Sequence, residues 1–271
     1  MVGQVEVKRN VSVVMTFCNS ANTILRSINS ILCQTSDSFE LILFNDGSTD
    51  ESMHLISEIR DDRIRIINSA TRIGRVAALN SAVSFAAGTY IAILDSDDLS
   101  HPDRILQQVD FLEKNPEFVA VSSWFSFVDG NDFLISKHQF STSPMDIRKR
   151  MTWNLPLTHS SMMYRKSVFV SCGKYDENYS FGEDFDLWIR MLSCGLIGAI
   201  PEYLTTIRIS SDSMTRSRHN RLSVARSSLS LYRRSRHLEK LDLVDSLRSL
   251  RTRFWLSFCI IRLHLNKHNV Y

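Results

Sequence analysis

The sequence predicts an α/β fold in which a mostly parallel sheet is covered by helices on both faces. Over the first hundred residues, apolar runs rich in β-branched residues alternate with segments whose apolar residues recur at helical spacing. Parallel neighbouring strands need a crossover, usually a helix, so this alternation favours a parallel sheet. The expected strands are 11–17, 39–46, 63–68 and 90–95, and the helices between them are 20–34, 50–60 and 74–87, the last ending at Gly88.

The pattern is less regular beyond residue 100. The expected elements there are a helix at 101–115, strands at 117–129 and 133–140, a short helix at 144–151, a strand at 157–165 and a helix at 182–195. Residues 205–271 carry 14 Lys/Arg against 4 Asp/Glu, and apolar residues recur at helical spacing from about residue 217. The sequence therefore predicts a domain over 1–216 and a basic helical C-terminal extension over 217–271.

Cysteine usage and hydropathy indicate the compartment. The five cysteines are odd in number and form no CxxC pair, which argues against a zinc site and a disulfide framework. Free thiols are typical of a reducing compartment. No apolar run approaches the ~18 residues of a membrane span, and the N-terminal run lacks the features of a secretory signal. We therefore expect a cytoplasmic protein.

The C-terminal extension suggests a partner. It combines many arginines with Phe254, Trp255 and Leu256, which suits an amphipathic helix on an anionic membrane. Helices that pack on the domain or on a second subunit of a homodimer fit the same composition. No recognition motif accompanies the charge, so nucleic acid is not an expected partner. Peripheral contact with the inner face of the cell membrane is the expected location.

Acidic residues follow two of the predicted strands. The stretch YIAILDSDD ends in Asp95, Asp97 and Asp98, and Asp46 follows the strand FELILFN. Ligands of open parallel sheets bind beyond the carboxyl ends of the strands. Carboxylates there can hold Mg²⁺ or Mn²⁺, which then neutralises substrate phosphates. The alternative is a solvated loop with ordinary turn and cap residues.

Two further groups of charged residues stand at predicted helix starts. Arg72 and Arg75 flank Gly74, which suits a phosphate site, although a solvated arginine pair is equally consistent. In GEDFDLWIRM, Glu183 and Asp184 either interact with the helix dipole or supply a general base.

These motifs together resemble the family-2 glycosyltransferases of the GT-A (Rossmann-like) fold. The matching segments are FNDGSTDES, RIGRVAALN, YIAILDSDD, HSSMMYRKS and GEDFDLWIRM, in order over residues 11 to about 214. The resemblance implies an inverting, metal-dependent transfer of a sugar from a nucleotide-diphosphate sugar, with UDP as the expected nucleotide. The implied acceptor is a hydroxyl of a lipid-linked saccharide in bacterial surface-polysaccharide biosynthesis.

The resemblance also implies residue roles. Asp184 is the expected catalytic base, with Glu183 beside it, and Asp97 is the expected ligand of Mn²⁺ or Mg²⁺. The acceptor side is expected near His159 and Trp188. The residues expected to bind the nucleotide sugar are Thr16, Asp46, Arg72, Asp95 and Ser96.

The chain departs from the family pattern at several positions. The first strand ends in Met15-Thr16-Phe17 where the family often has Pro, and Asn45-Asp46 replaces the usual Asp pair. Many members carry Tyr-Arg-x-His after the base, whereas this chain has Ile207-Arg208-Ile209-Ser210. Ser210 leaves open whether a third protein ligand exists for the metal.

Two other functions use the same acids. One is a metal-dependent nucleotidyl or phosphoryl transferase. Phosphatases with a DxD nucleophile place it after the first strand, where this chain has Thr16-Phe17-Cys18. The other is a nucleotide-binding module without catalysis, against which the pair Glu183 and Asp184 argues.

Overall fold

The computed structural model describes residues 10–152, 155–179, 181–209 and 252. The expected C-terminal extension, apart from residue 252, and the domain boundary at residue 216 lie outside these ranges and stay predictions. The strands are β1 (Val11–Phe17), β2 (Phe39–Asn45), β3 (Ile64–Asn68), β4 (Tyr90–Ile93), β5 (Leu99–Ser100), β6 (Phe118–Val128), β7 (Leu134–His138), β8 (Met163–Arg165) and β9 (Leu196–Arg208). The helices are α1 (Ile24–Leu32), α2 (Ser52–Ser57), α3 (Arg75–Ser84), α4 (Arg104–Lys114), α5 (Pro144–Arg150), α6 (Lys166–Ser171) and α7 (Glu183–Met191), with a 3₁₀ turn η1 (His159–Ser161).

The strands form one nine-stranded sheet in the order β3-β2-β1-β4-β8-β6-β9-β5, with β7 paired to β6. β1 to β4 are mutually parallel, with Val11 opposite both Phe39 and Tyr90. This half confirms the predicted strand–helix alternation. Every residue of β1 and β2 is buried, as expected for parallel strands covered on both faces.

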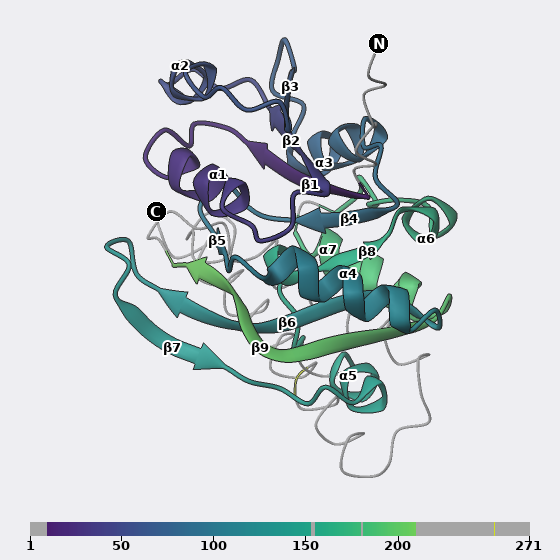
Figure 1. Cartoon of the computed structure of the whole chain (residues 1–271). Coiled ribbons are helices and arrows are strands. Elements are labelled where there is room, and N and C mark those ends of the chain that lie inside the picture. Colours follow the sequence, from purple (N-terminus) through teal and green to yellow (C-terminus); the bar gives the residue numbers. More distant parts are fainter. Residues whose placement is uncertain (1–9, 153–154, 180, 210–251, 253–271) are drawn as a thin grey trace, which may run out of the picture.

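Helices cover both faces of the sheet, as predicted. Val13 and Met15 of β1 face a core completed by α1, α2 and α4, whereas Val14 faces the core that α3, α5, α6 and α7 complete. This division follows from the alternation of side chains along a strand. Figure 1 shows α4 crossing in front of the sheet. Among the described residues, no helix is long and apolar enough to cross a membrane.

The second half of the sheet differs from the sequence-based expectation. The strand expected at 157–165 is the 3₁₀ turn η1 followed by the three-residue strand β8, antiparallel to β4 and β6. The sequence pattern does not predict β5, α6 or β9. β9 pairs in parallel with β6, but the register jumps from Ile200 to Tyr203. Pro201 lies in this interruption, where its missing N–H removes no hydrogen bond between the strands. Because a proline argues against a strand in a sequence, the pattern does not predict β9.

Gly88 does not end α3, which stops at Ser84. A Cβ on Gly88 would lie 2.5 Å from the backbone nitrogen of Ser12 and 2.7 Å from the carbonyl carbon of Val11. The Gly88 N–H also donates to Ser12 Oγ at 2.8 Å. Glycine is therefore required here by close approach to β1, which sets where β4 begins.

A buried arginine fixes the end of β4. Arg104 of α4 is 1% exposed and donates Nη2 to the carbonyls of Ile93 and Met162 at 2.9 and 3.1 Å. Burial lowers the pKa of Arg104 to about 9, although the nearby Asp98 opposes this shift. Because Ile93 is the last residue of β4, these bonds hold the loop that carries Asp95 and Asp97.

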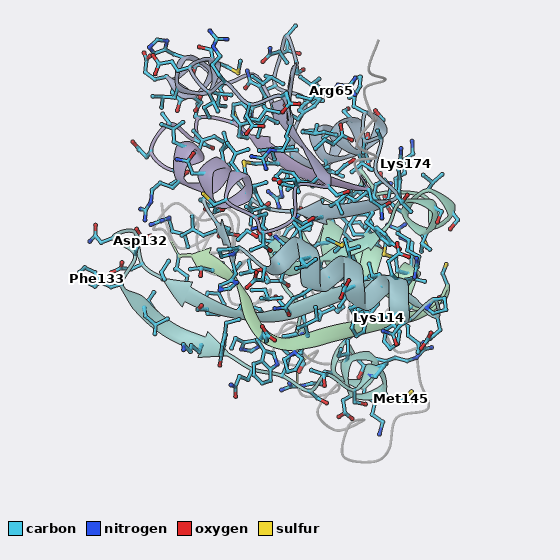
Figure 2. The ribbon with its side chains drawn as sticks, in the orientation of Figure 1. Arg65, Lys114, Asp132, Phe133, Met145 and Lys174 are labelled. Atoms are coloured by element: carbon cyan, nitrogen blue, oxygen red, sulfur yellow. The ribbon has the colours of Figure 1, made fainter. Side chains whose placement is uncertain are left out.

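The β6–β7 hairpin projects from the sheet. Phe133 at its tip is 70% exposed, and Figure 2 shows it pointing away from the molecule. The hairpin is held from the other side by Arg208, which forms an ion pair with Asp132 and donates to the carbonyl of Gly130 at 2.9 Å. The end of β9 is thereby attached to this hairpin.

Candidate active site

The acids expected to act lie where several elements end or begin at one edge of the sheet. Asp46 follows β2 and Asp95 follows β4, while Arg75 begins α3 and Glu183 begins α7. The turn η1 contributes His159 to the same group of residues. Residues more than a hundred positions apart are thus brought into one cluster at the carboxyl edge, as predicted for an open α/β sheet.

Arg75 is the centre of this cluster. Its Nε donates to Glu183 Oε1 at 2.9 Å, and its Nη2 donates to the two carboxylate oxygens of Asp95 at 2.9 and 3.1 Å. Nη2 also lies 3.0 Å from His159 Nδ1. One guanidinium therefore connects α3, the end of β4, η1 and α7. Planar guanidinium groups suit such multiple recognition of carboxylates.

The arginine and its acids stabilise each other's charges. Burial alone would lower the pKa of Arg75, but Asp95 and Glu183 outweigh it and raise the pKa well above its usual value. Burial alone would raise the pKa of Asp95, yet Arg75 and His159 hold it well below its usual range. Asp95 is therefore a carboxylate throughout the physiological pH range.

Both ring nitrogens of His159 have polar neighbours. Nδ1 lies 3.0 Å from Arg75 Nη2 and 3.5 Å from Asp95 Oδ1, and Nε2 lies 2.9 Å from Tyr175 Oη. His159 is 6% exposed. Its ring is therefore a polar bridge between the Arg75 cluster and the core.

Neighbouring carboxylates repel the charges of Asp97 and Asp98. At Asp95, the positive charge of Arg75 offsets such repulsion. Burial, together with the charge of Asp95, raises the pKa of Asp97 to about 6. Asp98 is more buried, and burial and Asp97 raise its pKa well above the usual value. Asp98 accepts the backbone N–H of Arg208 at 2.9 Å, so it attaches the loop to β9. Asp97 is less buried than Asp98, so of the two it carries the carboxylate that a cation could reach.

A divalent ion fits this chemistry. No group of three His, Cys, Asp or Glu side chains suited to a metal occurs in the described part of the chain, and Ser210 lies outside that part. Mg²⁺ commonly takes only one or two protein carboxylates and completes its shell with substrate phosphates and water. Asp97 offers one such oxygen donor, and an ion there would relieve its repulsion with Asp95.

Asp46 shapes the loop ahead of α3. Its Oδ1 accepts the N–H of Ile73 at 2.6 Å, and its Oδ2 accepts that of Gly74 at 3.1 Å. Gly74 has φ +94°, a conformation that favours glycine. At Gly47, a Cβ would come within 2.8 Å of the backbone nitrogen of Arg72. The backbone around Arg72 is thus fixed, whereas its side chain is exposed.

Glu183 and Asp184 differ in environment. Glu183 is 6% exposed and is held by Arg75, whereas the Asp184 carboxylate accepts only from the N–H of Phe185, at 2.7 Å, among the hydrogen bonds of the described residues. Burial and the neighbouring Glu183 raise the pKa of Asp184. A raised pKa makes a carboxylate a stronger base. Of the pair, Asp184 is the one available to accept a proton.

The other predicted residues lie around this cluster. Thr16 is 8% exposed at the end of β1, and Ser96 Oγ lies 2.9 Å from Ser20 Oγ. Trp188 is fully buried, with its ring 6.3 Å from that of His159. Trp188 packs in the core next to His159, and its side chain is not exposed to solvent, where an acceptor would bind. The assigned roles of these residues stay predictions.

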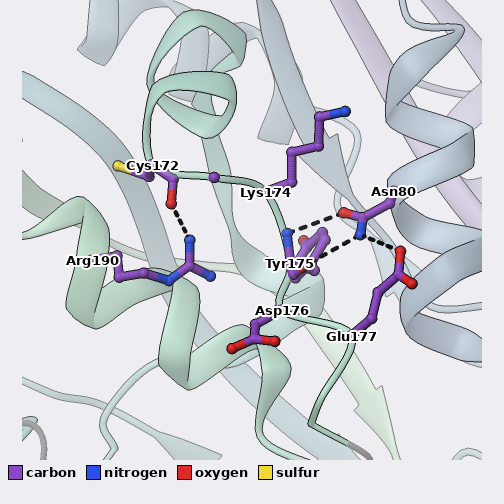
Figure 3. A pocket seen from close by; sticks show the side chains of 8 residues that line it. Asn80, Cys172, Lys174, Tyr175, Asp176, Glu177 and Arg190 are labelled. Carbon is purple, nitrogen blue, oxygen red and sulfur yellow. Dashed lines mark hydrogen bonds between the residues drawn. The ribbon is translucent and has the colours of Figure 1, made fainter.

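Some contacts have no clear sequence signal. The sequence predicts Arg75 only as one of a phosphate-binding pair, and nothing in it singles out Ser160, whose Oγ accepts the N–H of Asp95 at 3.0 Å. The same holds for Tyr175, whose Oη lies 2.9 Å from His159 Nε2. Tyr175 lines a cavity of about 440 Å³, together with Asn80 and Glu177 (Figure 3). The local hint for Arg75 is that it directly follows Gly74 in the sequence.

The comparisons with known proteins agree with this architecture. The model of glycosyl transferase family 2 matches residues 12–173. The Escherichia coli protein WfaP, named UDP-Glc:alpha-D-GlcNAc-diphosphoundecaprenol beta-1,3-glucosyltransferase, is 30% identical over 69% of this chain and 71% of its own length. An uncharacterized glycosyltransferase of Haemophilus influenzae is 30% identical over 73% of this chain.

Solved structures resemble the whole fold. S. aureus TarS 1–349 in complex with UDP-GlcNAc aligns with a TM-score of 0.67 and 15% identity, covering 96% of this chain and 72% of that one. The molecule is thus a Rossmann-like α/β protein of the GT-A type. With the family match, the chain belongs to glycosyltransferase family 2. It spans 65% of the length of the Haemophilus influenzae relative and 38% of that from Rickettsia felis.

Replacing Arg75 will destabilise the protein by leaving two acids without their cation. We expect Arg75→Gln to lower the free energy of unfolding by about 2 kcal/mol at pH 7.5, because partly buried carboxylates lose their partner. The pKa of Asp95 is depressed well below its unfolded value of about 3.9, so this stabilisation is present above about pH 4 and is lost as the pH falls further toward the folded pKa. Urea unfolding at pH 7.5, pH 4 and pH 2.5 measures both effects: the difference between the two chains should be nearly the same at the first two values and smaller at the third.

The control for this variant is Arg72→Gln. Arg72 is exposed, so its replacement is expected to change the free energy of unfolding by less than about 0.5 kcal/mol. Equal effects of the two substitutions would contradict the central role of Arg75.

Asp97→Asn is expected to stabilise the protein at pH 8 but not at pH 4. The pKa of Asp97 is about 6 in the folded chain, against about 3.9 when unfolded. The folded state therefore binds the extra proton, and stability falls as pH rises between these values. Allowing for solvent screening, removing the charge should add about 1–2 kcal/mol at pH 8.

Thermal unfolding between pH 4 and pH 8 measures this difference. Asp110→Asn serves as the control because Asp110 lies in an exposed ion pair with Lys114, and it should show no such pH-dependent gain. A constant difference between Asp97→Asn and the unsubstituted chain across this range would refute the raised pKa.

Proposed function

We propose that this chain is an inverting glycosyltransferase that moves a sugar from a UDP-linked donor to a hydroxyl of a lipid-linked saccharide. The observation that carries the proposal is the pairing of Asp184 with the cluster around Arg75. A carboxylate of raised pKa stands at the start of α7, while Arg75 joins the neighbouring Glu183 to Asp95 at the sheet edge. The proposed base is thus the sequence neighbour of a residue that belongs to the cluster proposed to hold the donor.

The reaction would proceed by a single displacement. Asp184 takes the proton of the acceptor hydroxyl as its oxygen attacks the anomeric carbon of the donor. The bond from that carbon to the diphosphate oxygen breaks, and its electron pair leaves with the UDP. Attack from the side opposite the leaving group inverts the configuration. Glu183, held by Arg75, fixes the start of α7 and so orients its neighbour Asp184.

The donor site would extend along the sheet edge. Mn²⁺ or Mg²⁺, when bound through Asp97, supplies positive charge for the leaving diphosphate. Asp46 is proposed to accept an N–H of the base: its oxygens receive the N–H groups of Ile73 and Gly74, and a carboxylate has about four acceptor positions. Thr16, Arg72, Asp95 and Ser96 complete this proposed site.

The relatives support the choice of substrates. WfaP is named for UDP-Glc as donor and a diphosphoundecaprenol-linked sugar as acceptor, and TarS was solved with UDP-GlcNAc. The first of these motivates the lipid-linked acceptor and a role in surface-polysaccharide biosynthesis at the inner face of the cell membrane. His159 is buried, so its proposed contribution to the acceptor side acts through Arg75 and Tyr175.

The alternative functions have less support. A phosphoryl transferase with an aspartate nucleophile after the first strand has no such residue here, because Cys18, Asn19 and Ser20 follow β1. Asn19 serves the neighbouring turn instead, where its Oδ1 accepts the N–H of Thr49 at 2.8 Å. A module that only binds nucleotide gives no reason for Asp184 to be kept in an environment that raises its pKa.

Asp184→Asn is expected to abolish transfer while donor binding is kept. Loss of a general base should lower the rate of transfer by about 10²–10⁴-fold. Transfer is measured as UDP release in the presence of acceptor, and donor binding as the rise in melting temperature with UDP-sugars and Mn²⁺. The control Asp110→Asn should keep both, and Asp97→Asn should lose the donor-induced rise.

Two outcomes would count against this proposal. Transfer that survives in Asp184→Asn removes the assigned role of that residue. Absence of a donor-induced rise with every UDP-, GDP- and dTDP-sugar tested would remove the nucleotide-sugar reading.

Deleting residues 217–271 is expected to prevent membrane association without loss of donor binding. The basic composition of this segment favours anionic lipid. Sedimentation with vesicles of anionic phospholipid, compared with neutral vesicles, measures association. If the shortened chain sediments as before, membrane contact does not depend on this segment. If it instead changes from dimer to monomer by light scattering, the segment serves a second subunit.

A further inference from the structure

Two cysteines meet at the ends of neighbouring helices. Cys172 follows the last residue of α6, and Cys194 lies three positions beyond the end of α7. Their Sγ atoms are 3.0 Å apart, although the residues are 22 positions apart in sequence. A disulfide bond needs about 2.05 Å between the sulfurs. The thiols thus stand in direct contact, close to bonding distance.

The surrounding structure holds the two helix ends together without the sulfurs. Arg190, in the last turn of α7, donates Nη1 to the carbonyl of Cys172, as Figure 3 shows. The same side chain is fixed on its own helix, because its Nε donates to Asp186 Oδ2 at 2.8 Å. The contact between the thiols is therefore maintained by a folded framework, which gives each thiol a high effective concentration toward the other.

Both thiols are reachable, but unequally. Cys194 is exposed and Cys172 is partly exposed. Cys172, Gly173 and Lys174 are among the residues that line the cavity of about 440 Å³. Burial and the neighbouring Cys194 raise the pKa of the Cys172 thiol to about 11. A small oxidant would consequently react first at Cys194. Cys172 is the thiol that would then form the disulfide bond with Cys194.

We propose that Cys172 and Cys194 form a reversible intramolecular disulfide by exchange with a low-molecular-mass disulfide. The Cys194 thiolate attacks one sulfur of the small disulfide, forms a mixed disulfide and releases one small thiolate. Cys172 loses its proton to solvent as its sulfur attacks Cys194 Sγ, and the second small thiolate leaves. Two protein thiols are oxidised, and one small disulfide is reduced to two thiols.

The bond would close the segment that carries the acids of α7. Residues between Cys172 and Cys194 include Tyr175, Glu183 and Asp184. The hydrogen bonds and ion pairs of Arg75 involve neither sulfur, so closure need not move the acids. Its effect is to restrain the unfolding of the segment, because a cross-link removes conformational freedom from the unfolded chain. This inference does not depend on the proposed transferase activity.

Peptide mapping of the full chain tests the proposal directly. The protein is incubated folded with oxidised glutathione, quenched with acid, alkylated and digested with trypsin without reduction. Cys172 and Cys194 fall in the separate peptides 167–174 and 191–208. We expect these peptides to be joined, with a mass two hydrogens below their sum, and to separate on reduction.

Melting temperatures test the restraint. Oxidation should raise the melting temperature of the unsubstituted chain by roughly 5–10 °C, and the rise should disappear in Cys194→Ser. The matched control is Cys33→Ser, which removes an exposed cysteine at the end of α1 and should keep both the cross-link and the rise.

Three results would overturn the proposal. Glutathione adducts on Cys172 or Cys194 without the joined peptide would mean that the thiols react singly. A cross-link found only between two chains would place the bond elsewhere. A joined peptide without any rise in melting temperature would remove the claimed restraint on the segment.

Discussion

The contact on which the cluster depends is the one between the Arg75 guanidinium and the carboxylates of Asp95 and Glu183. It connects a residue at the start of α3 with one 108 positions later, and the same guanidinium lies 3.0 Å from His159 Nδ1. Without this cation, the turn after β4 and the start of α7 would repel each other. Burial and the charge of Asp95 still raise the pKa of Asp97 to about 6, while Arg75 keeps Glu183 in place beside Asp184. Asp95 and Glu183, which lie on different elements, are thus held together by one arginine.

The net charge of the cluster is its second important property. Arg75 carries one positive charge and faces the two carboxylates of Asp95 and Glu183, so these three side chains together are negative even before Asp97 and Asp184 ionise. A nucleotide diphosphate would bring further negative charge to this edge. The energy of such an arrangement is unfavourable in a partly buried site unless a cation accompanies the phosphates. This deficit of positive charge is the physical argument for a divalent ion at Asp97, independent of family resemblance.

The parallel half of the sheet could be predicted because its signals are local. Apolar strand runs end in Asp46 and Asp95, and each can be located by periodicity and turn residues within a few positions. The second half could not, because its determinants are long-range: β9 contains Pro201, which reads as a break until the register shift against β6 is seen. Glycine at residue 88 resembled a helix end, yet close approach to Ser12 requires it. Likewise, no sequence spacing relates Arg75 to Glu183, or Cys172 to Cys194, since only the fold brings these side chains together.

The loop between β3 and α3 holds both Asp46 and the residue that precedes Arg75 with the same stretch of backbone. Asp46 receives the N–H groups of Ile73 and Gly74, and the next residue is Arg75. A side chain expected to meet the nucleobase is therefore anchored to the same few peptide units that aim the arginine at the acids. In the proposed function, selectivity for the nucleotide and the arrangement of the catalytic groups would therefore depend on the same backbone. Exchanging Asp46 to accept a different base would also remove the hydrogen bonds that fix the residues just before Arg75.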